Sequence, residues 1–174
     1  MAMPGLANLQ RRHIVIGAIR SVTTSVIVLV LYFVVPINER AGATIAFRLV
    51  AGLAFFAAVL AYEVRSILRS PQPFLRAANA LALVIPLFLL VFAWTYLTMG
   101  LSDPGAFSEV LDRPSALYFT VTTFSTVGYG DIHAVSDPAR MVVTLQMAAD
   151  LIVIAVVVRL ILEAARGAVR SNQN

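Results

Sequence analysis

Four long apolar stretches dominate the chain, and each has the length of a membrane-spanning helix. Crossing about 30 Å of hydrocarbon as a helix takes roughly 20 residues. The stretches are Ile14–Val35, Ala41–Tyr62, Ala77–Ser102 and Ala139–Glu163. We expect Pro86 to kink the third helix rather than end it, because helices in a membrane setting tolerate proline. The pattern predicts an all-α integral membrane protein with four transmembrane helices.

The composition agrees with a membrane location. The sequence is 60% hydrophobic and 13% charged, and its mean hydropathy is +0.87, more apolar than one soluble core of this size requires. All 13 basic residues are arginines, and they are scattered rather than clustered, so no nucleic-acid partner is expected. Cysteine is absent, and no His, Asp and Glu cluster suggests metal or acid–base chemistry. We expect a lipid bilayer as the environment and no enzymatic activity.

The arginines divide unevenly between the two ends of the predicted helices. One side has Arg11, Arg12, Arg65, Arg69, Arg76, Arg159, Arg166 and Arg170, and the other has Arg40, Arg113 and Arg140 with most of the acidic residues. By the positive-inside rule, the arginine-rich side faces the cytoplasm. This predicts a multi-pass protein of the cell membrane whose termini, residues 1–13 and 164–174, are both cytoplasmic.

The connection from Leu101 to Pro138 is too long for a simple hairpin and is partly apolar. Within it, residues 114–125 begin with proline, which suits a first helical turn, and continue without glycine. A helix of this length rises only about 18 Å, so it would enter the membrane and stop partway. Its C-terminal end would then face the bilayer interior, where the helix dipole favours a cation.

The segment that follows is Thr126-Val127-Gly128-Tyr129-Gly130, and here the sequence resembles the potassium channel family. The glycines permit positive φ angles, which let successive carbonyl oxygens point toward one axis and replace the water shell of an ion. The resemblance implies a selectivity filter over residues 126–130, with K⁺ held at Thr126, Val127, Gly128 and Tyr129 and no organic cofactor. Val127 and Tyr129 would point away from the axis and brace the filter.

The resemblance covers residues 77–163 and implies a pore domain with an outer helix (77–100), a pore helix (114–125) and an inner helix (139–163). One chain supplies one strand of the filter, so the implied assembly is a homotetramer with fourfold cyclic symmetry. The two preceding helices, within residues 14–64, would be peripheral to the pore, and the sequence gives them no function.

Four residues are implied to support the filter: Tyr118, Thr122, Thr123 and Asp131. In the family pattern, an aromatic residue behind the filter hydrogen-bonds the aspartate after Gly-Tyr-Gly, so Tyr118 and Asp131 form the candidate pair. The usual aromatic is Trp, and a phenol is shorter, so we expect a weaker or water-mediated restraint. Thr122 stands where relatives often have Glu or Val, which excludes a carboxyl pair with Asp131.

The fourth helix carries a carboxylate near its middle, Asp150, which is costly in a membrane. Two arrangements would compensate it: a ring of four such carboxylates in the cavity below the filter, our working hypothesis, or hydrogen bonds from the hydroxyls of Thr122, Thr123 or Ser125. Gln146, one turn earlier, would assist either arrangement. Apolar residues at helical spacing on this helix resemble the pore-facing stripe of the family's inner helix. Packing between helices or contact with lipid is the alternative role for each of them. The residues are Met147, Leu151, Ile154, Val158 and Leu162.

No helix carries arginine at every third position, so we expect no voltage sensor, and we expect residues 164–174 to be too few for a gating domain. The sequence does not distinguish a gate at Leu162 and its neighbours from a gate within the filter. Control by a ligand would need a separate regulatory protein. A potassium-uptake transporter would carry four pore units in one chain, and this chain has one. The remaining alternative to a potassium channel subunit is a non-conducting membrane scaffold or regulatory subunit.

Overall fold

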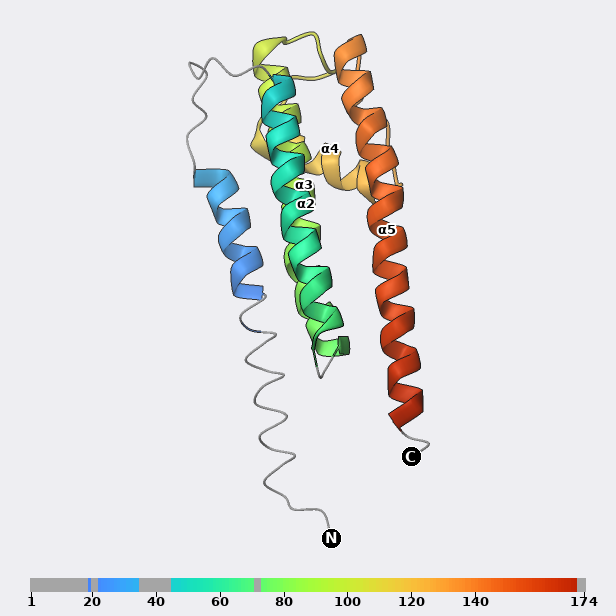
Figure 1. Cartoon of the computed structure of the whole chain (residues 1–174). Coiled ribbons are helices and arrows are strands. Elements are labelled where there is room, and N and C mark those ends of the chain that lie inside the picture. Colours follow the sequence, from blue (N-terminus) through green and yellow to red (C-terminus); the bar gives the residue numbers. More distant parts are fainter. Residues whose placement is uncertain (1–18, 20–21, 35–44, 71–72, 172–174) are drawn as a thin grey trace.

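The computed structural model describes residues 19, 22–34, 45–70 and 73–171, and within them the chain is helical without a β-strand. A short helix over Val22–Val34 precedes α2 (Ile45–Leu68), α3 (Pro73–Ser102), α4 (Arg113–Phe124) and α5 (Asp137–Ser171). Figure 1 shows α2, α3 and α5 running side by side, with α4 lying across the bundle in one half of its length.

Three of the described helices are long and apolar enough to cross a membrane: Ile45–Leu68, Arg76–Ser102 and Asp137–Arg159. They correspond to the second, third and fourth predicted spans. The first predicted span, Ile14–Val35, lies partly outside the described residues, and its described part is the Val22–Val34 helix. The predictions for residues 1–13 and for 172–174 also lie outside the described residues.

Two helices extend beyond the ends that the apolar pattern predicts. α2 continues from Tyr62 to Leu68, and α5 continues from Glu163 to Ser171, so most of the predicted C-terminal segment is helical. The added residues are largely Ala, Arg, Glu and Leu, which favour helix whether or not they lie in hydrocarbon. The apolar pattern therefore locates the hydrocarbon-spanning part of each helix but not the helix end.

α3 lies at the centre of the fold and contacts α2, α4 and α5. Phe88, Phe92 and Tyr96 stand four residues apart on one face of α3, and each is almost fully buried. Neighbouring rings in this row lie 5.1 Å and 6.2 Å apart between centroids, and Phe56 of α2 packs 5.1 Å from Phe88. Such edge-to-face and tilted aromatic contacts stabilise the helix pairing beyond simple burial.

α3 continues through Pro86 without a break. Proline has no N–H, so the carbonyl of Ala82, four residues earlier, loses its helical partner. The hydroxyl of Ser25, in the Val22–Val34 helix, donates to this carbonyl. A neighbouring helix thus supplies the hydrogen bond that proline removes, which hydrocarbon could not do.

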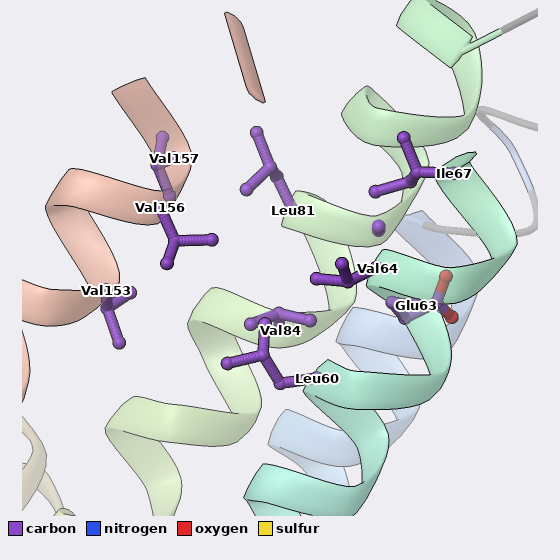
Figure 2. A pocket seen from close by; sticks show the side chains of 10 residues that line it. Leu60, Glu63, Val64, Ile67, Leu81, Val84, Val153, Val156 and Val157 are labelled. Carbon is purple, nitrogen blue, oxygen red and sulfur yellow. The ribbon is translucent and has the colours of Figure 1, made fainter. Parts of the chain in front are cut away.

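An apolar groove lies between α2, α3 and α5 toward the end of the bundle away from α4 (Figure 2). It is lined by Leu60, Glu63, Val64, Ile67, Ala80, Leu81, Val84, Val153, Val156 and Val157. The carboxylate of Glu63 is directed away from the valine and leucine side chains in Figure 2. Apart from Glu63, the lining of this groove is aliphatic.

Candidate functional site

α4 begins at a defined cap. The carboxylate of Asp112 accepts a hydrogen bond from the backbone N–H of Ser115 at 2.8 Å, and Pro114 stands in the first turn. Hydrogen bonding with the side chain of Ser115, and then with its backbone N–H, lowers the pKa of Asp112. The helix occupies Arg113–Phe124, close to the predicted 114–125, and Ser125 is its C-cap. The cap was not predicted, although an aspartate three residues before a serine, with proline between them, is a recognisable start signal.

The buried side of α4 packs on the aromatic row of α3. Ala116, Phe119 and Thr120 are buried on this side. The ring of Phe119 lies 5.1 Å from Tyr96 and 5.6 Å from Phe107 between centroids. Core packing therefore determines the position of α4 and of the segment that follows it, residues 126–130.

The backbone after α4 adopts positive φ at every second residue. Gly128 has φ of 51° and Gly130 of 81°, as the sequence predicts, and Thr126 has φ of 59°, which it does not. A threonine in this region is uncommon because its branched side chain crowds the backbone. Strain of this kind persists only where surrounding structure holds it, and it concentrates at functional sites.

The amide groups of this segment point back toward α4. The carbonyl of Thr122 accepts from the N–H of Val127 at 3.1 Å and of Gly128 at 3.2 Å, and the N–H of Thr126 donates to Thr123 at 3.0 Å. In the described part of the chain, no donor is directed at the carbonyl oxygens of residues 126–129. These four oxygens are available to a ligand, and a carbonyl ligand set suits a cation.

Tyr118 and Asp131 hold the far end of the segment. The phenol of Tyr118 donates to the Asp131 carboxylate at 2.7 Å, so the contact is direct rather than water-mediated. This hydrogen bond lowers the pKa of Asp131. The ring of Tyr118 also stacks on Tyr129, with an interplanar angle of 3° and centroids 6.5 Å apart. The Tyr118 side chain, although shorter than that of Trp, therefore contacts both Asp131 and Tyr129.

A loop before α4 makes a second contact with the same region, which the sequence did not indicate. The hydroxyl of Ser108 donates to the Asp131 carbonyl at 3.2 Å and accepts from the N–H of His133 at 3.0 Å. The N–H of Ser108 donates to the His133 carbonyl at 2.9 Å, beside an isolated bridge between Phe107 and Ala134. Serine in a loop is common, so spacing alone carries no signal for this role.

A buried polar cluster joins α3, α4 and α5. The hydroxyl of Tyr96 donates to the Gln146 side-chain oxygen at 2.6 Å, and the Gln146 amide donates to the backbone carbonyl of Thr120 at 3.2 Å. The same amide lies 3.5 Å from one carboxylate oxygen of Asp150. Gln146 is fully buried and Asp150 is 3% exposed.

Neither arrangement predicted for Asp150 is present in the single chain. A cavity ring requires an exposed face, and Asp150 belongs instead to the buried stripe of α5, with Ala139, Val143, Gln146 and Val153. The hydroxyls named as partners are engaged elsewhere, since Thr122 and Thr123 donate to the Phe119 carbonyl and Ser125 donates to that of Val121. The same burial removes Gln146 from the predicted cavity lining.

The predicted apolar stripe of α5 lies about a quarter turn from Asp150, as the helix repeat requires. Its members are exposed on the single chain: Met147, Leu151, Ile154, Val158 and Leu162. A surface of this kind is open to a neighbouring subunit, to a cavity or to lipid. The sequence placed Asp150 with this stripe, and the packing against α3 and α4 separates the two.

A protein-family model described as "Ion channel" matches residues 84–166. The matched range begins within α3 and includes α4, the segment after it and most of α5. No solved structure matches the chain. The family match and the apolar helices support a multi-pass membrane protein with an ion channel domain.

Proposed function

We propose that this chain is one subunit of a potassium-selective channel, and that residues 126–130 form its selectivity filter. The proposal rests on the backbone carbonyl oxygens of residues 126–129, to which no donor is directed in the described part of the chain. Positive φ angles alternate along the segment, and the N–H groups of residues 126–128 donate to α4. Carbonyl oxygens in such a row replace the hydration shell of K⁺.

Exposure of this segment supports assembly into a ring. Residues 126–130 are all exposed on the single chain, and Tyr129 is 72% exposed. Non-helical backbone at membrane depth is tolerated only where protein covers it or where it lines a water-filled path. Copies of the same chain around an axis would meet both conditions, and four of them give the closed carbonyl ring of a homotetramer.

Each neighbouring element has a role in this proposal. α4 directs its C-terminal dipole at the ion path, and the Thr126 side chain adds an oxygen at the inner end. Tyr118 and Asp131 hold the outer end, with Thr122 and Thr123 at the end of α4. Below the filter the cavity is lined by the apolar stripe, Leu151, Ile154, Val158 and Leu162, and closure takes place either near Leu162 or in the filter. The uneven arginine distribution places both termini in the cytoplasm of the cell.

Flux through liposomes tests the proposal. The purified full chain is reconstituted with an outward K⁺ gradient, and K⁺ and Na⁺ flux are compared with and without Ba²⁺. We expect rapid K⁺ flux that Ba²⁺ blocks and little Na⁺ flux. Equal flux of both ions would exclude selectivity, and no flux of either would favour a non-conducting scaffold or regulatory subunit.

Two glycine variants sharpen this experiment. Gly128→Ala meets no atom within 4 Å in the single chain, so within the subunit its effect comes from the positive φ rather than from a clash. Gly105→Ala, in the loop before α4, meets only Asp103 Oδ1 at 3.4 Å, an ordinary contact, and has no positive φ. We expect selective flux to be lost in Gly128→Ala and kept in Gly105→Ala, with both proteins folded.

A further inference from the structure

The turn between α2 and α3 forms a polar hollow at the end of the bundle away from α4. It is lined by Tyr62, Arg65, Ser66, Arg69, Ser70 and Arg76. The hollow is open to solvent, so a ligand can reach it from the surface. Its lining contrasts with the aliphatic groove of Figure 2, which lies on the opposite face of α2.

One wall of the hollow is fixed by hydrogen bonds and an ion pair. The Arg76 guanidinium donates to the Ser66 hydroxyl at 2.9 Å and lies 3.5 Å from the Glu63 carboxylate. Arg65, in the last turn of α2, and Arg69, the residue after its end, are both exposed. Three arginines face one carboxylate, so the net charge of the hollow and its rim is +2.

The surroundings of this charge favour an anion. α3 begins at Pro73 without an acidic residue in its first turn, so the positive end of its dipole is not neutralised locally. Arginine presents a planar fork of donors that matches the oxygens of a phosphate group. A phosphate monoester or diester is therefore the ligand chemistry that this hollow fits.

The apolar face above the hollow indicates that the phosphate belongs to a lipid. Phe55 and Tyr62 are seven residues apart, two helical turns, so they share the face of α2 that carries Arg69. Phe55 is 60% exposed and Tyr62 is 66% exposed. An exposed tyrosine next to arginines marks the headgroup level of a bilayer, and an exposed phenylalanine deeper on the same face offers contact to an acyl chain.

We propose that this hollow binds the phosphate headgroup of an anionic phospholipid from the arginine-rich leaflet. Arg65 and Arg69 contact the phosphate, Arg76 forms the fixed wall, and the acyl chains lie along Phe55. The inference rests on the membrane orientation of the proposed function but not on ion selectivity. Because α2 packs on α3 and α3 on α4, an occupied hollow would also stabilise the packing that supports the filter.

Lipid binding is measured on the intact protein in detergent by native mass spectrometry. Phosphatidylglycerol, phosphatidylcholine and inorganic phosphate are titrated separately into the full chain. We expect phosphatidylglycerol to bind more tightly than phosphatidylcholine, and inorganic phosphate not to displace it at equal concentration. Displacement by free phosphate, or equal binding of the two lipids, would overturn the proposal.

Three variants assign the binding to the hollow. Arg65→Gln with Arg69→Gln should weaken phosphatidylglycerol binding roughly fivefold for each arginine removed, the size expected for a cation near an anionic surface. Arg65→Lys with Arg69→Lys keeps the charge and should retain most of the binding. Arg140→Gln removes one charge at the other end of the bundle and should change the affinity less than twofold. Equal loss in Arg140→Gln would overturn the assignment, and none of these measurements depends on ion flux.

Discussion

Tyr32 and Arg113 exchange hydrogen bonds between two helices that lie 81 residues apart in the sequence. The Tyr32 phenol donates to the Arg113 carbonyl at 2.9 Å, and the Arg113 guanidinium donates to the Tyr32 carbonyl at 2.5 Å. The guanidinium also lies over the ring of Trp94, 5.9 Å from its centroid. The Val22–Val34 helix is thereby attached directly to the start of α4.

Replacing Tyr32 by Phe tests this attachment. The ring still packs against Leu90 and Ala93, but the donor to Arg113 is lost. We expect the free energy of unfolding to fall by about 1 kcal/mol, the usual net contribution of one hydrogen bond. Thermal unfolding of the purified protein in detergent measures it. Tyr62→Phe is the control, because Tyr62 is 66% exposed, and a shift of the same size in both variants would contradict the interpretation.

The hydrogen bond from Ser25 to Ala82 can be isolated by a double-mutant cycle with Pro86. Ser25→Ala should destabilise the protein by about 1 kcal/mol, because the freed carbonyl then lies in hydrocarbon. With Pro86→Ala also present, the residue 86 N–H bonds the Ala82 carbonyl within α3, so Ser25→Ala should cost much less. Unfolding of all four proteins in detergent gives the coupling. Additive effects would mean that Ser25 does not compensate for the proline.

Asp150 should have little effect on the ion path, because it is buried inside the subunit. We expect Asp150→Asn to leave K⁺ conductance and block by internal polyvalent cations unchanged. Single-channel recording measures both. Ile154→Asp, which adds a carboxylate to the exposed stripe of α5, is the positive control and should strengthen block. Reduced conductance in Asp150→Asn would restore the cavity ring.

Acidification of the outer solution tests the hydrogen bond between Tyr118 and Asp131. The pKa of Asp131 is lower in the folded protein than in the unfolded chain, so the carboxylate stabilises the fold above its ordinary pKa of about 3.9. This contribution is lost as the pH falls through the lowered value. K⁺ flux into liposomes should therefore be constant from about pH 7 to 5 and decline only below about 4.

Asp131→Asn is the matched variant and should remove this acid-dependent decline. A decline of the same size in Asp131→Asn would contradict the role of this hydrogen bond.

Local signals in the sequence located most of the described helices and the positive φ angles of two residues after α4. Apolar length identified α2, α3 and α5, and the proline at residue 114 identified the start of α4 within one residue. Gly128 and Gly130 were predicted to have positive φ because glycine alone adopts it freely. A positive φ was not predicted for Thr126. Its conformation depends on hydrogen bonds between residues 126–128 and α4, and residue type alone does not indicate such bonds.

The role of Asp150 was misjudged because periodicity cannot say which face of a helix is inside. Asp150 and the exposed stripe lie only about a quarter turn apart, so spacing alone allows both to face a cavity. The packing of Gln146 against Tyr96 and Thr120 shows that the Asp150 side of α5 is buried. The contacts of the Val22–Val34 helix were also beyond prediction. Ser25 and Tyr32 are unremarkable residues, and their partners lie more than 50 residues away.

The hydrogen bond from Ser25 to the Ala82 carbonyl limits how this protein can be shortened. A shortened chain that begins at α3 would keep α4, residues 126–130 and α5, but the Ala82 carbonyl would lose its donor, at the same cost of about 1 kcal/mol as in Ser25→Ala. Separating α3, α4 and α5 from the rest of the chain should therefore be better tolerated with Pro86 replaced. The proline makes the stability of α3 depend on the Val22–Val34 helix, so residues 73–171 are not an independent structural module.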